Sequence, residues 1–208
     1  MPDEEPREDF HEPDSQSQGA VPTEGAAATG VSPIAASEAM VLDEVVAAVV
    51  ERFPDSIAHD SHGQPVVYVA PGSWHDVAAF LRDEERFTQC LDVTVVDHLA
   101  DQQRLQVPGV TPERFEVVAN YLSHPRNRRI RTICEISADD PKVPSIVDVY
   151  PGVNFGEREA YDMYGVVFDG HPDLTRILMP DDWVGYPLRK DDAPARVPVA
   201  FKGDPSPR

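Results

Sequence analysis

Apolar and polar residues alternate along several consecutive stretches in the middle of the chain. In the stretch Gln89–Asp97, the side chains of Leu91, Val93 and Val95 point to one side and polar side chains to the other. Comparable apolar or alternating stretches lie at residues 65–70, 115–121 and 129–137. A period of two residues is typical of a β-strand, and alternation in successive strands is typical of an antiparallel sheet with one covered face. The pattern therefore predicts an antiparallel sheet of about four strands.

Apolar residues at helical spacing predict helices that cover this sheet. The first helix spans residues 37–53 and ends at Pro54. The second runs from residue 74 to about residue 85, and Ser73 with Asp76 forms a capping box at its start. Strands and helices in this order predict a single α+β domain, with the sheet covered by two or three helices.

A third, short helix is predicted at residues 155–164. Asn154 and Glu157 form an N-x-x-E capping box at its start, and Gly165 stands where a left-handed residue ends a helix. Glycines and prolines from Gly170 onward exclude a long regular element after it. The chain therefore continues as an irregular segment.

Four regions follow from these patterns. Residues 1–36 are acidic and rich in Pro, Ala and Gly, and they hold too few large apolar side chains to offset the entropy lost on ordering, so we expect a disordered tail. Residues 37–152 form the α+β domain. Residues 153–190 form a motif segment of the same domain, made of the short helix and an irregular docking segment. Residues 191–208 contain four prolines and are predicted to be an extended C-terminal arm.

Charge and cysteine content exclude several classes of function. The chain has 18 Lys and Arg against 37 Asp and Glu, a net charge of −19, and residues 1–39 contribute −8 from nine acids and one arginine. A surface this acidic disfavours nucleic acid as the main partner. Cys90 and Cys134 form no zinc or iron–sulfur motif, and we expect both to be buried in strands. The absence of a leader and of an apolar run of about 18 residues predicts a chain that is not inserted in a membrane.

The sequence predicts no catalytic, cofactor or metal site in this chain. The run His59–His62 offers two imidazoles and one carboxylate, but a metal site needs further ligands, and the run is interpreted as a surface loop. The carboxylates between residues 157 and 173 have no Ser or Cys nucleophile among them. The glycines are isolated, so neither a dinucleotide fingerprint nor a phosphate-binding loop is present.

Two groups of residues favour contact with another protein. Arg129 and Arg131 share one face of their strand; they either pair with carboxylates of a partner or form a solvated, charged strand edge, and both interpretations stay open. The irregular segment is rich in arginine and tryptophan, which are enriched in interface hot spots. On the third helix, Arg158 and Asp162 are four residues apart and are expected to pair. The candidate interface residues are Arg129, Arg131, Glu157, Arg158, Asp162, His171, Asp173, Arg176, Trp183 and Arg189.

Several of these runs resemble the signature of a known family. The runs GEREAYDMYGVVFDGHPDL, RILMPDDW and GYPLRKD, between residues 156 and 191, and SHPRNRRIR at residues 123–131 are similar to the C subunit of respiratory complex I, the proton-translocating NADH:quinone oxidoreductase. The similarity covers roughly residues 66–191. The chain departs from the family pattern locally, with Phe155 and Tyr186 where the family usually has Trp and His.

This resemblance implies a structural role in a larger assembly. It implies that the chain binds no flavin or iron–sulfur cluster, whereas FMN, iron–sulfur clusters, NADH and quinone belong to the assembled complex. It also implies that subunits D and B of complex I are the partners, in a peripheral arm on the cytoplasmic side of the membrane, with the C-terminal arm lying on the first of these. One alternative is the homologous subunit of a deazaflavin-dependent dehydrogenase or of a membrane-bound hydrogenase. A remote alternative is a free-standing metal hydrolase that uses His59, His62, His171 and nearby carboxylates.

Overall fold

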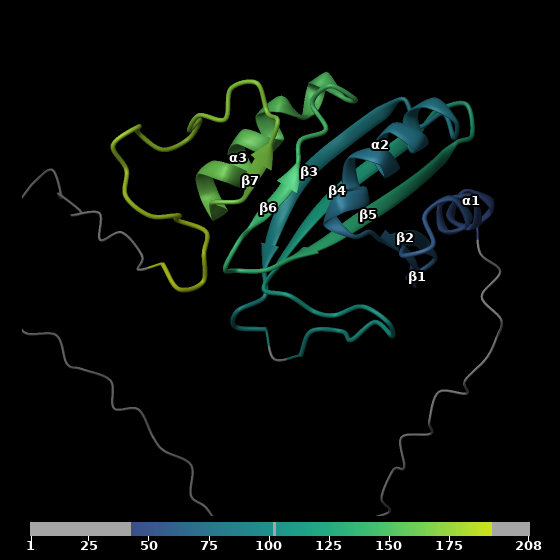
Figure 1. Ribbon diagram of the computed structural model, residues 1–208, viewed down its shortest axis with the longest axis horizontal. Helices are drawn as coiled ribbons and strands as arrows, with labels where there is room; N and C mark the ends of the chain where they lie inside the picture. Colours follow the sequence, from purple (N-terminus) through teal and green to yellow (C-terminus); the bar gives the residue numbers. More distant parts are fainter. Residues whose placement is uncertain (1–42, 102, 193–208) are drawn as a thin grey trace, which may run out of the picture. The chain divides into compact units, whose positions relative to one another are not determined.

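A computed structural model of the chain describes residues 43–101 and 103–192 (Figure 1). Its centre is a five-stranded sheet with the strand order β1-β2-β5-β4-β3. The strands are β1 (Ile57–Ser61), β2 (Gln64–Tyr68), β3 (Gln89–Asp97), β4 (Phe115–Ser123) and β5 (Arg128–Ile136). Neighbouring strands are antiparallel except β2 and β5, which are parallel. The predicted α+β fold is therefore confirmed, with a sheet that is mostly antiparallel.

Three helices and a second, small sheet complete the fold. The helices are α1 (Glu44–Arg52), α2 (Trp74–Asp83) and α3 (Asn154–Tyr164), and the short 3₁₀ turns η1 (Pro71–Ser73) and η2 (Pro151–Val153) lead into α2 and α3. The strands β6 (Lys142–Pro144) and β7 (Val167–Asp169) pair in parallel. One cluster of buried residues joins the three helices to one face of the large sheet (Figure 1). Among the described residues, no helix has both the length and the apolar character needed to span a bilayer.

Alternation along β4 separates the two faces of the sheet. Its residues on the covered face are at most 1% exposed; they are Phe115, Val117, Ala119 and Tyr121. The opposite face carries a smaller cluster in which Tyr68 packs against buried residues. That cluster consists of Val66, Val118 and Ile133. Because β4 and β5 are central, both of their faces are at least partly covered.

Leu91 does not follow the predicted alternation of β3. The pairing of β3 with β4 shifts between Cys90 and Asp92, which marks a β-bulge. Leu91 is 49% exposed, whereas Val93 and Val95 on the same predicted face are buried. A bulge inserts one residue into a period of two, so the alternation rule assigns the residue before it to the wrong face.

The stretch His59–His62 was wrongly predicted to be a surface loop. Its first three residues belong to β1, which pairs with β2 at the edge of the sheet. His62 and Gly63 both have positive φ, 56° and 78°, as the two-residue turns of hairpins require. Asp60 Oδ1 accepts a hydrogen bond from Gly63 N at 2.9 Å and closes the turn. The polar composition of this edge strand hid it, because the strand buries little apolar surface.

Two helix starts differ from the sequence expectation. α1 begins at Glu44, where Asp43 Oδ1 accepts a hydrogen bond from Val45 N at 3.0 Å, and residues 37–42 lie outside the described residues. The capping box at Ser73 was wrong, because Ser73 has helical dihedral angles and its side chain makes no capping hydrogen bond. The 3₁₀ turn η1 carries the chain into α2 without the extended residue that a capping box needs. The predicted tail at residues 1–36 and residues 193–208 of the predicted arm also lie outside the described residues.

Candidate functional site

The candidate site consists of α3 and residues 170–192, which follow β7 without regular secondary structure (Figure 1). We call residues 170–192 the irregular segment. Six of the predicted interface residues lie on α3 or on the part of the irregular segment up to Arg176, and Trp183 and Arg189 lie further along it, with only Arg129 and Arg131 elsewhere. The contacts between helix and segment therefore determine what this surface presents.

Asp162 on α3 fixes the course of the irregular segment. Its Oδ2 accepts hydrogen bonds from the backbone nitrogens of Ile177, Leu178 and Met179 at 3.0, 2.8 and 2.9 Å. Its Oδ1 accepts a hydrogen bond from Arg176 Nη1 at 2.5 Å, and the carboxylate is completely buried. Burial raises the pKa of the Asp162 carboxyl, but the three backbone N–H groups and Arg176 outweigh it, so the pKa lies below its usual range.

Arg158 does not pair with Asp162, so that prediction was wrong. Its Nε donates to the carbonyl oxygen of Thr175 at 3.1 Å, and its Nη2 donates to Thr175 Oγ1 at 2.9 Å and to the carbonyl oxygen of Arg176 at 3.2 Å. A spacing of four residues brings two side chains together only when both stay on the helix surface. Asp162 points into the protein, whereas Arg158 reaches over the surface to hold the irregular segment.

Arg176 and Arg189 pack on either side of the Tyr186 ring. Their guanidinium carbons lie 5.6 and 4.5 Å from its centroid, within the range of cation–π contacts. Arg176 Nη2 donates to the carbonyl oxygen of Gly185 at 3.1 Å, and Arg189 Nε donates to that of Tyr164 at 2.5 Å. Both arginines were expected to be exposed interface residues, but in this structure their head groups support the irregular segment from within.

Gly165 ends α3 in the left-handed conformation that the sequence predicted, with φ 73° and ψ 26°. The glycine also allows a close approach, because a Cβ atom at this position would lie 2.5 Å from the Tyr186 ring and 2.8 Å from Arg189 Nη2. A side chain here would therefore be disfavoured both by the backbone angle and by the packing of the irregular segment.

Asp97 and Arg114 anchor the end of the irregular segment to the sheet. The carboxylate of Asp97 accepts hydrogen bonds from Arg114 Nε and Nη2 at 3.0 and 2.9 Å, and from the backbone nitrogen of Lys190 at 2.9 Å. Arg114 also donates to Asp191, with Nη1 at 2.9 Å from Oδ2. Burial raises the pKa of Asp97, but these hydrogen bonds prevail and lower it to about 2.

Sequence reasoning missed this anchor, although one signal was present. Asp97 falls on the same face of β3 as the buried Val93 and Val95, so alternation alone places an acidic residue inside the protein. A buried carboxylate requires a cationic or hydrogen-bonding partner. That requirement could have directed attention to the arginine just before β4.

Glu157 is a buried carboxyl rather than a member of a capping box. Asn154 already has helical dihedral angles, φ −46° and ψ −49°, so it cannot act as the capping residue. The carboxylate of Glu157 turns inward, where its Oε2 accepts from Ser145 Oγ at 2.6 Å and its Oε1 accepts from Ile146 N at 2.8 Å. Burial raises the pKa of Glu157 to about 7, because two hydrogen bonds do not compensate for its loss of water.

His171 closes the turn that follows β7. Its Nδ1 accepts a hydrogen bond from Asp173 N at 3.0 Å, and its Nε2 lies 3.4 Å from the carbonyl oxygen of Asn154. An accepting Nδ1 requires a neutral ring that carries its proton on Nε2. Burial lowers the pKa of His171 and favours that neutral form. Asp173 is exposed, and its backbone is the part that takes part in the turn.

Four large apolar side chains on α3 and the irregular segment are exposed. Phe155, Leu178, Val184 and Leu188 are 64%, 60%, 93% and 46% exposed. We call these four residues the apolar surface. Single exposed apolar residues are common in proteins, but four on elements that internal hydrogen bonds hold in place are typical of a protein–protein contact. Trp183 lies in the same segment, and its Nε1 is buried with no hydrogen-bond partner among the described residues.

Arg129 and Arg131 lie on the second face of the sheet, as their alternation predicted. Arg131 Nε donates to Asn120 Oδ1 at 3.1 Å. Within residues 43–101 and 103–192, no carboxylate lies within ion-pair distance of either arginine. A groove of about 220 Å³ runs between them and β3, with Leu91 and Asp92 on its far side. Its positive side is thus formed by two arginines without acidic partners in this part of the chain.

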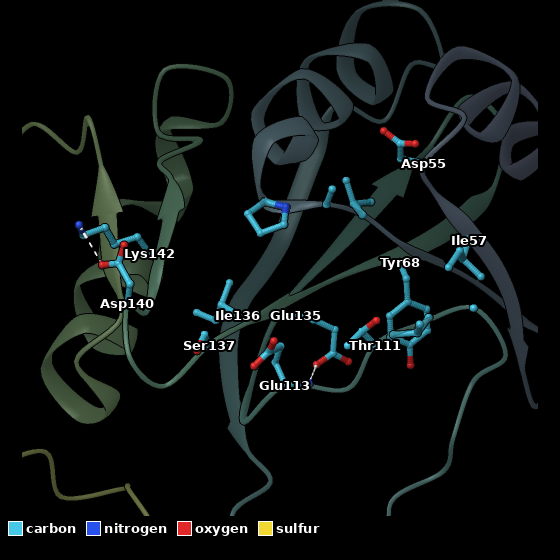
Figure 2. Close-up of a pocket in the computed structure, with 15 residues that line it drawn as sticks. Asp55, Ile57, Tyr68, Thr111, Glu113, Glu135, Ile136, Ser137, Asp140 and Lys142 are labelled. Atoms are coloured by element: carbon cyan, nitrogen blue, oxygen red, sulfur yellow. Dashed lines mark hydrogen bonds and ion pairs between the residues drawn. The ribbon is translucent and has the colours of Figure 1, made fainter.

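A larger cavity, of about 590 Å³, lies where β2 and β5 end (Figure 2). Figure 2 shows Asp140 and Lys142 paired at one side and Ile57 and Tyr68 at the other, and the pair is 2.9 Å apart. Glu135 Oε2 accepts a hydrogen bond from the backbone nitrogen of Glu113 at 2.9 Å. Part of the acidic lining is therefore engaged in internal contacts.

No arrangement typical of a metal centre is present in the part of the chain that the structure describes. No group of three or more His, Cys, Asp and Glu side chains is placed to hold a metal ion there. His59 lies on β1 and His171 lies in the turn after β7, and each has its own local contacts. The geometry gives the metal-hydrolase hypothesis no support.

The sequence matches a described protein family over most of the domain. Residues 67–197 match the family "Respiratory-chain NADH dehydrogenase, 30 Kd subunit". Over 169 residues, the chain is 41% identical to the C subunit of the NADH-quinone oxidoreductase of Salinispora arenicola, and the match covers 77% of this chain and 65% of that protein. It is also 41% identical over 168 residues to the same subunit of Roseiflexus castenholzii, covering 78% of this chain and 91% of the relative.

Two solved structures are similar to this fold. The trypsin-resistant fragment (1–134) of Nqo5 is 28% identical and superposes with a TM-score of 0.53, covering 62% of this chain and 96% of the fragment. A polypeptide of the membrane-bound sulfane sulfur reductase, an archaeal respiratory membrane complex, is 22% identical with a TM-score of 0.54 and covers 77% of this chain. At that identity, the second similarity shows the fold alone.

Proposed function

The chain belongs to the family of the respiratory-chain NADH dehydrogenase 30 kDa subunit, and we propose that it is a structural subunit of an NADH–quinone oxidoreductase. In this role it docks on other subunits through α3 and the irregular segment and does no chemistry itself. Electrons pass from NADH through FMN and iron–sulfur clusters to quinone in the assembled complex, which couples this transfer to proton translocation. The partners are subunits D and B of the peripheral arm, on the cytoplasmic side of the membrane.

The contacts of Asp162 carry this proposal. A carboxylate that binds three successive backbone nitrogens and one arginine holds the irregular segment in a single course. An isolated domain gains little from ordering an extended segment whose apolar residues remain in water, because the ordering costs conformational entropy. A segment that is ordered before it binds loses less entropy on association, which favours a role in docking.

The charged residues of the site fit a supporting role better than a catalytic one. Arg158, Arg176 and Arg189 direct their hydrogen bonds to backbone oxygens within the chain. In the proposed complex, residues 193–208 extend the docking surface along the first of the two partners as the C-terminal arm. Contacts of this kind position the subunits that hold the cofactors and the quinone.

Substitutions on the apolar surface test the proposal. Leu178→Asp and Val184→Asp place a charge on side chains that are 60% and 93% exposed in the free chain, so the fold should tolerate them. A buried aspartate without a partner at an interface is strongly unfavourable. We expect at least a roughly tenfold lower recovery of subunits D and B with the tagged chain from its native host, since each 1.4 kcal/mol of binding energy corresponds to about tenfold.

A matched control distinguishes docking from a general effect of added charge. Leu105→Asp changes a side chain that is 70% exposed on the loop between β3 and β4, away from α3. This variant should recover the partners at the wild-type level. Equal recovery with all three variants would rule out the apolar surface as the docking site, and failure of the wild-type chain to recover either partner would refute the proposed complex.

A subunit of a different respiratory assembly is the second candidate. The relatives that are about 40% identical over most of the chain are NADH-quinone oxidoreductase subunits, which favours the first proposal. The proteins that co-purify with the tagged chain distinguish the two, because only the first assembly contains an NADH-oxidising flavoprotein.

A further inference from the structure

The groove beside Arg129 and Arg131 has the character of a site for an acidic peptide segment. Asp92 is the one carboxylate among the groove-lining residues, so the two arginines leave it with a net positive charge. Asn120 holds Arg131 in place, and Leu91, turned outward by the bulge, adds exposed apolar surface. The volume of 220 Å³ lies below the roughly 300–1,000 Å³ that is typical of small-molecule pockets. An extended segment that places one side chain in the groove fits it better than a cofactor does.

The described part of the chain begins at the end of the sheet where this groove lies. Asp43, which caps α1, lies with Oδ2 3.3 Å from Nη1 of Arg128, the first residue of β5. Arg129 follows directly, and Gln64 at the start of the neighbouring strand β2 also lines the groove. Residues that precede Asp43 therefore leave the domain close to the two arginines.

The residues before Asp43 include a segment of complementary chemistry. Residues 3–14 contain seven acidic residues and one arginine, and Phe10 lies among them. Residues 15–42 contain only two further acids, so the negative charge is concentrated at one place. The 28 residues between Asp14 and Asp43 span a root-mean-square distance of roughly 30 Å as a flexible chain, which is sufficient to reach the groove.

We propose that residues 3–14 bind in this groove within the same molecule. Phe10 packs against Leu91 and Pro65, and the neighbouring carboxylates pair with Arg129 and Arg131. Exposed ion pairs are weak individually, but a tether supplies an effective concentration on the order of millimolar. The contact is accordingly weak and salt-sensitive. It covers the two arginines in the free subunit until an acidic surface of a partner displaces the segment.

Zero-length cross-linking in the full chain tests this contact. Arg129→Lys keeps the charge and introduces an amine that a carbodiimide joins to a carboxylate in direct contact. Arg52→Lys is the matched control, because Arg52 is exposed on α1 and lies closer in sequence to the acidic segment. At low salt we expect cross-links from position 129 to Glu8, Asp9 or Glu12 at least about threefold above those from position 52, and equal yields at about 0.5 M salt, where exposed charges are screened.

Further variants and labels decide the remaining outcomes. Phe10→Ala should reduce the cross-links from position 129, because the apolar contact then contributes nothing. Equal yields from positions 129 and 52 at low salt would overturn the proposal, since they describe a tail with no preferred contact. A mixture of ¹⁵N-labelled and unlabelled chains identifies links between molecules by mass spectrometry. Links that join two chains would overturn the intramolecular contact in favour of a second copy.

Discussion

Replacing Asp162 with alanine should release the irregular segment while leaving the sheet and its helices folded. The substitution removes the acceptor of three backbone N–H groups and of Arg176 Nη1 at once. All four donors belong to residues 176–179, and none belongs to the sheet. The loss is therefore concentrated on the irregular segment and not on the main core.

The contacts set the size of this effect. Removing one partner of a buried ion pair typically destabilises by about 3–5 kcal/mol, because the remaining charge and donors lose their compensation. Arg176 retains a little solvent exposure, 16% of its side chain, so the lower part of that range applies. A change of about 3 kcal/mol corresponds to roughly a hundredfold change in the equilibrium between the docked and the released segment.

Hydrogen exchange measured by mass spectrometry is the direct assay. In Asp162→Ala, the backbone amides of residues 177–179 should exchange up to about a hundredfold faster, whereas those of β4 should exchange at the wild-type rate. The same variant should recover less of subunits D and B from the host, because the apolar surface is no longer held in one arrangement. Asp173→Ala is the matched control, since its exposed carboxylate lies in the same segment and has no such donors.

Two results would refute this reasoning. Wild-type exchange at residues 177–179 would mean that other contacts hold the segment and that Asp162 contributes little. Fast exchange combined with normal recovery of the partners would mean that the order of the segment is unimportant for assembly. Global unfolding of the variant would instead show that α3 and the main core depend on Asp162 directly.

Three further outcomes are expected. Because the pKa of Glu157 is raised to about 7 from an ordinary 4.5, its stabilising contribution is complete below about pH 4.5 and is lost as the pH rises through 7; in urea unfolding, wild type should therefore lose about 2–3 kcal/mol relative to Glu157→Gln between pH 5 and 8, and a constant difference would contradict the burial argument. Gly165→Ala and Gly170→Ala impose similar backbone strain at positive φ, but only the first meets the Tyr186 ring, so it should be less stable by about a further 1–2 kcal/mol in the same assay, and equal losses would show that the ring moves aside freely. Deleting residues 193–208 should leave the melting temperature unchanged, since Asp191 and Arg114 remain paired, but should lower the recovery of partner subunits; unchanged recovery would show that this arm does not dock.

The strands were predictable because their signal is local. β3, β4 and β5 alternate with a period of two, and burial of one face requires that pattern wherever a sheet is covered on one side. The edge strand β1 gave no such signal, and the bulge before Asp92 moved Leu91 out of the predicted row. Alternation thus located the strands, whereas pairing determined the face that each residue occupies.

The end of α3 shows the same division within one site. Gly165 was predictable as the helix stop, because a glycine tolerates the left-handed backbone at no steric cost. The need for a small residue against Tyr186, 21 positions later, was not predictable from neighbouring residues. The two buried acids of α3 were misassigned for a related reason. Glu157 and Asp162 satisfied local rules for a capping box and a helical pair, but both side chains turn inward to donors elsewhere.

By itself the sequence determined the fold class, the central strands, the helix stop at Gly165 and the family signature, because each depends on residues that are close together along the chain. The tertiary structure decided which charges meet. Asp162 binds a segment 14–17 residues away, and Arg114 binds Asp191, 77 residues away. Partners at such separations are selected by how the elements pack and by the cost of leaving a buried charge without a hydrogen bond. Composition indicated a surface rich in charged groups, and only packing showed that most of these groups hold an apolar surface in place.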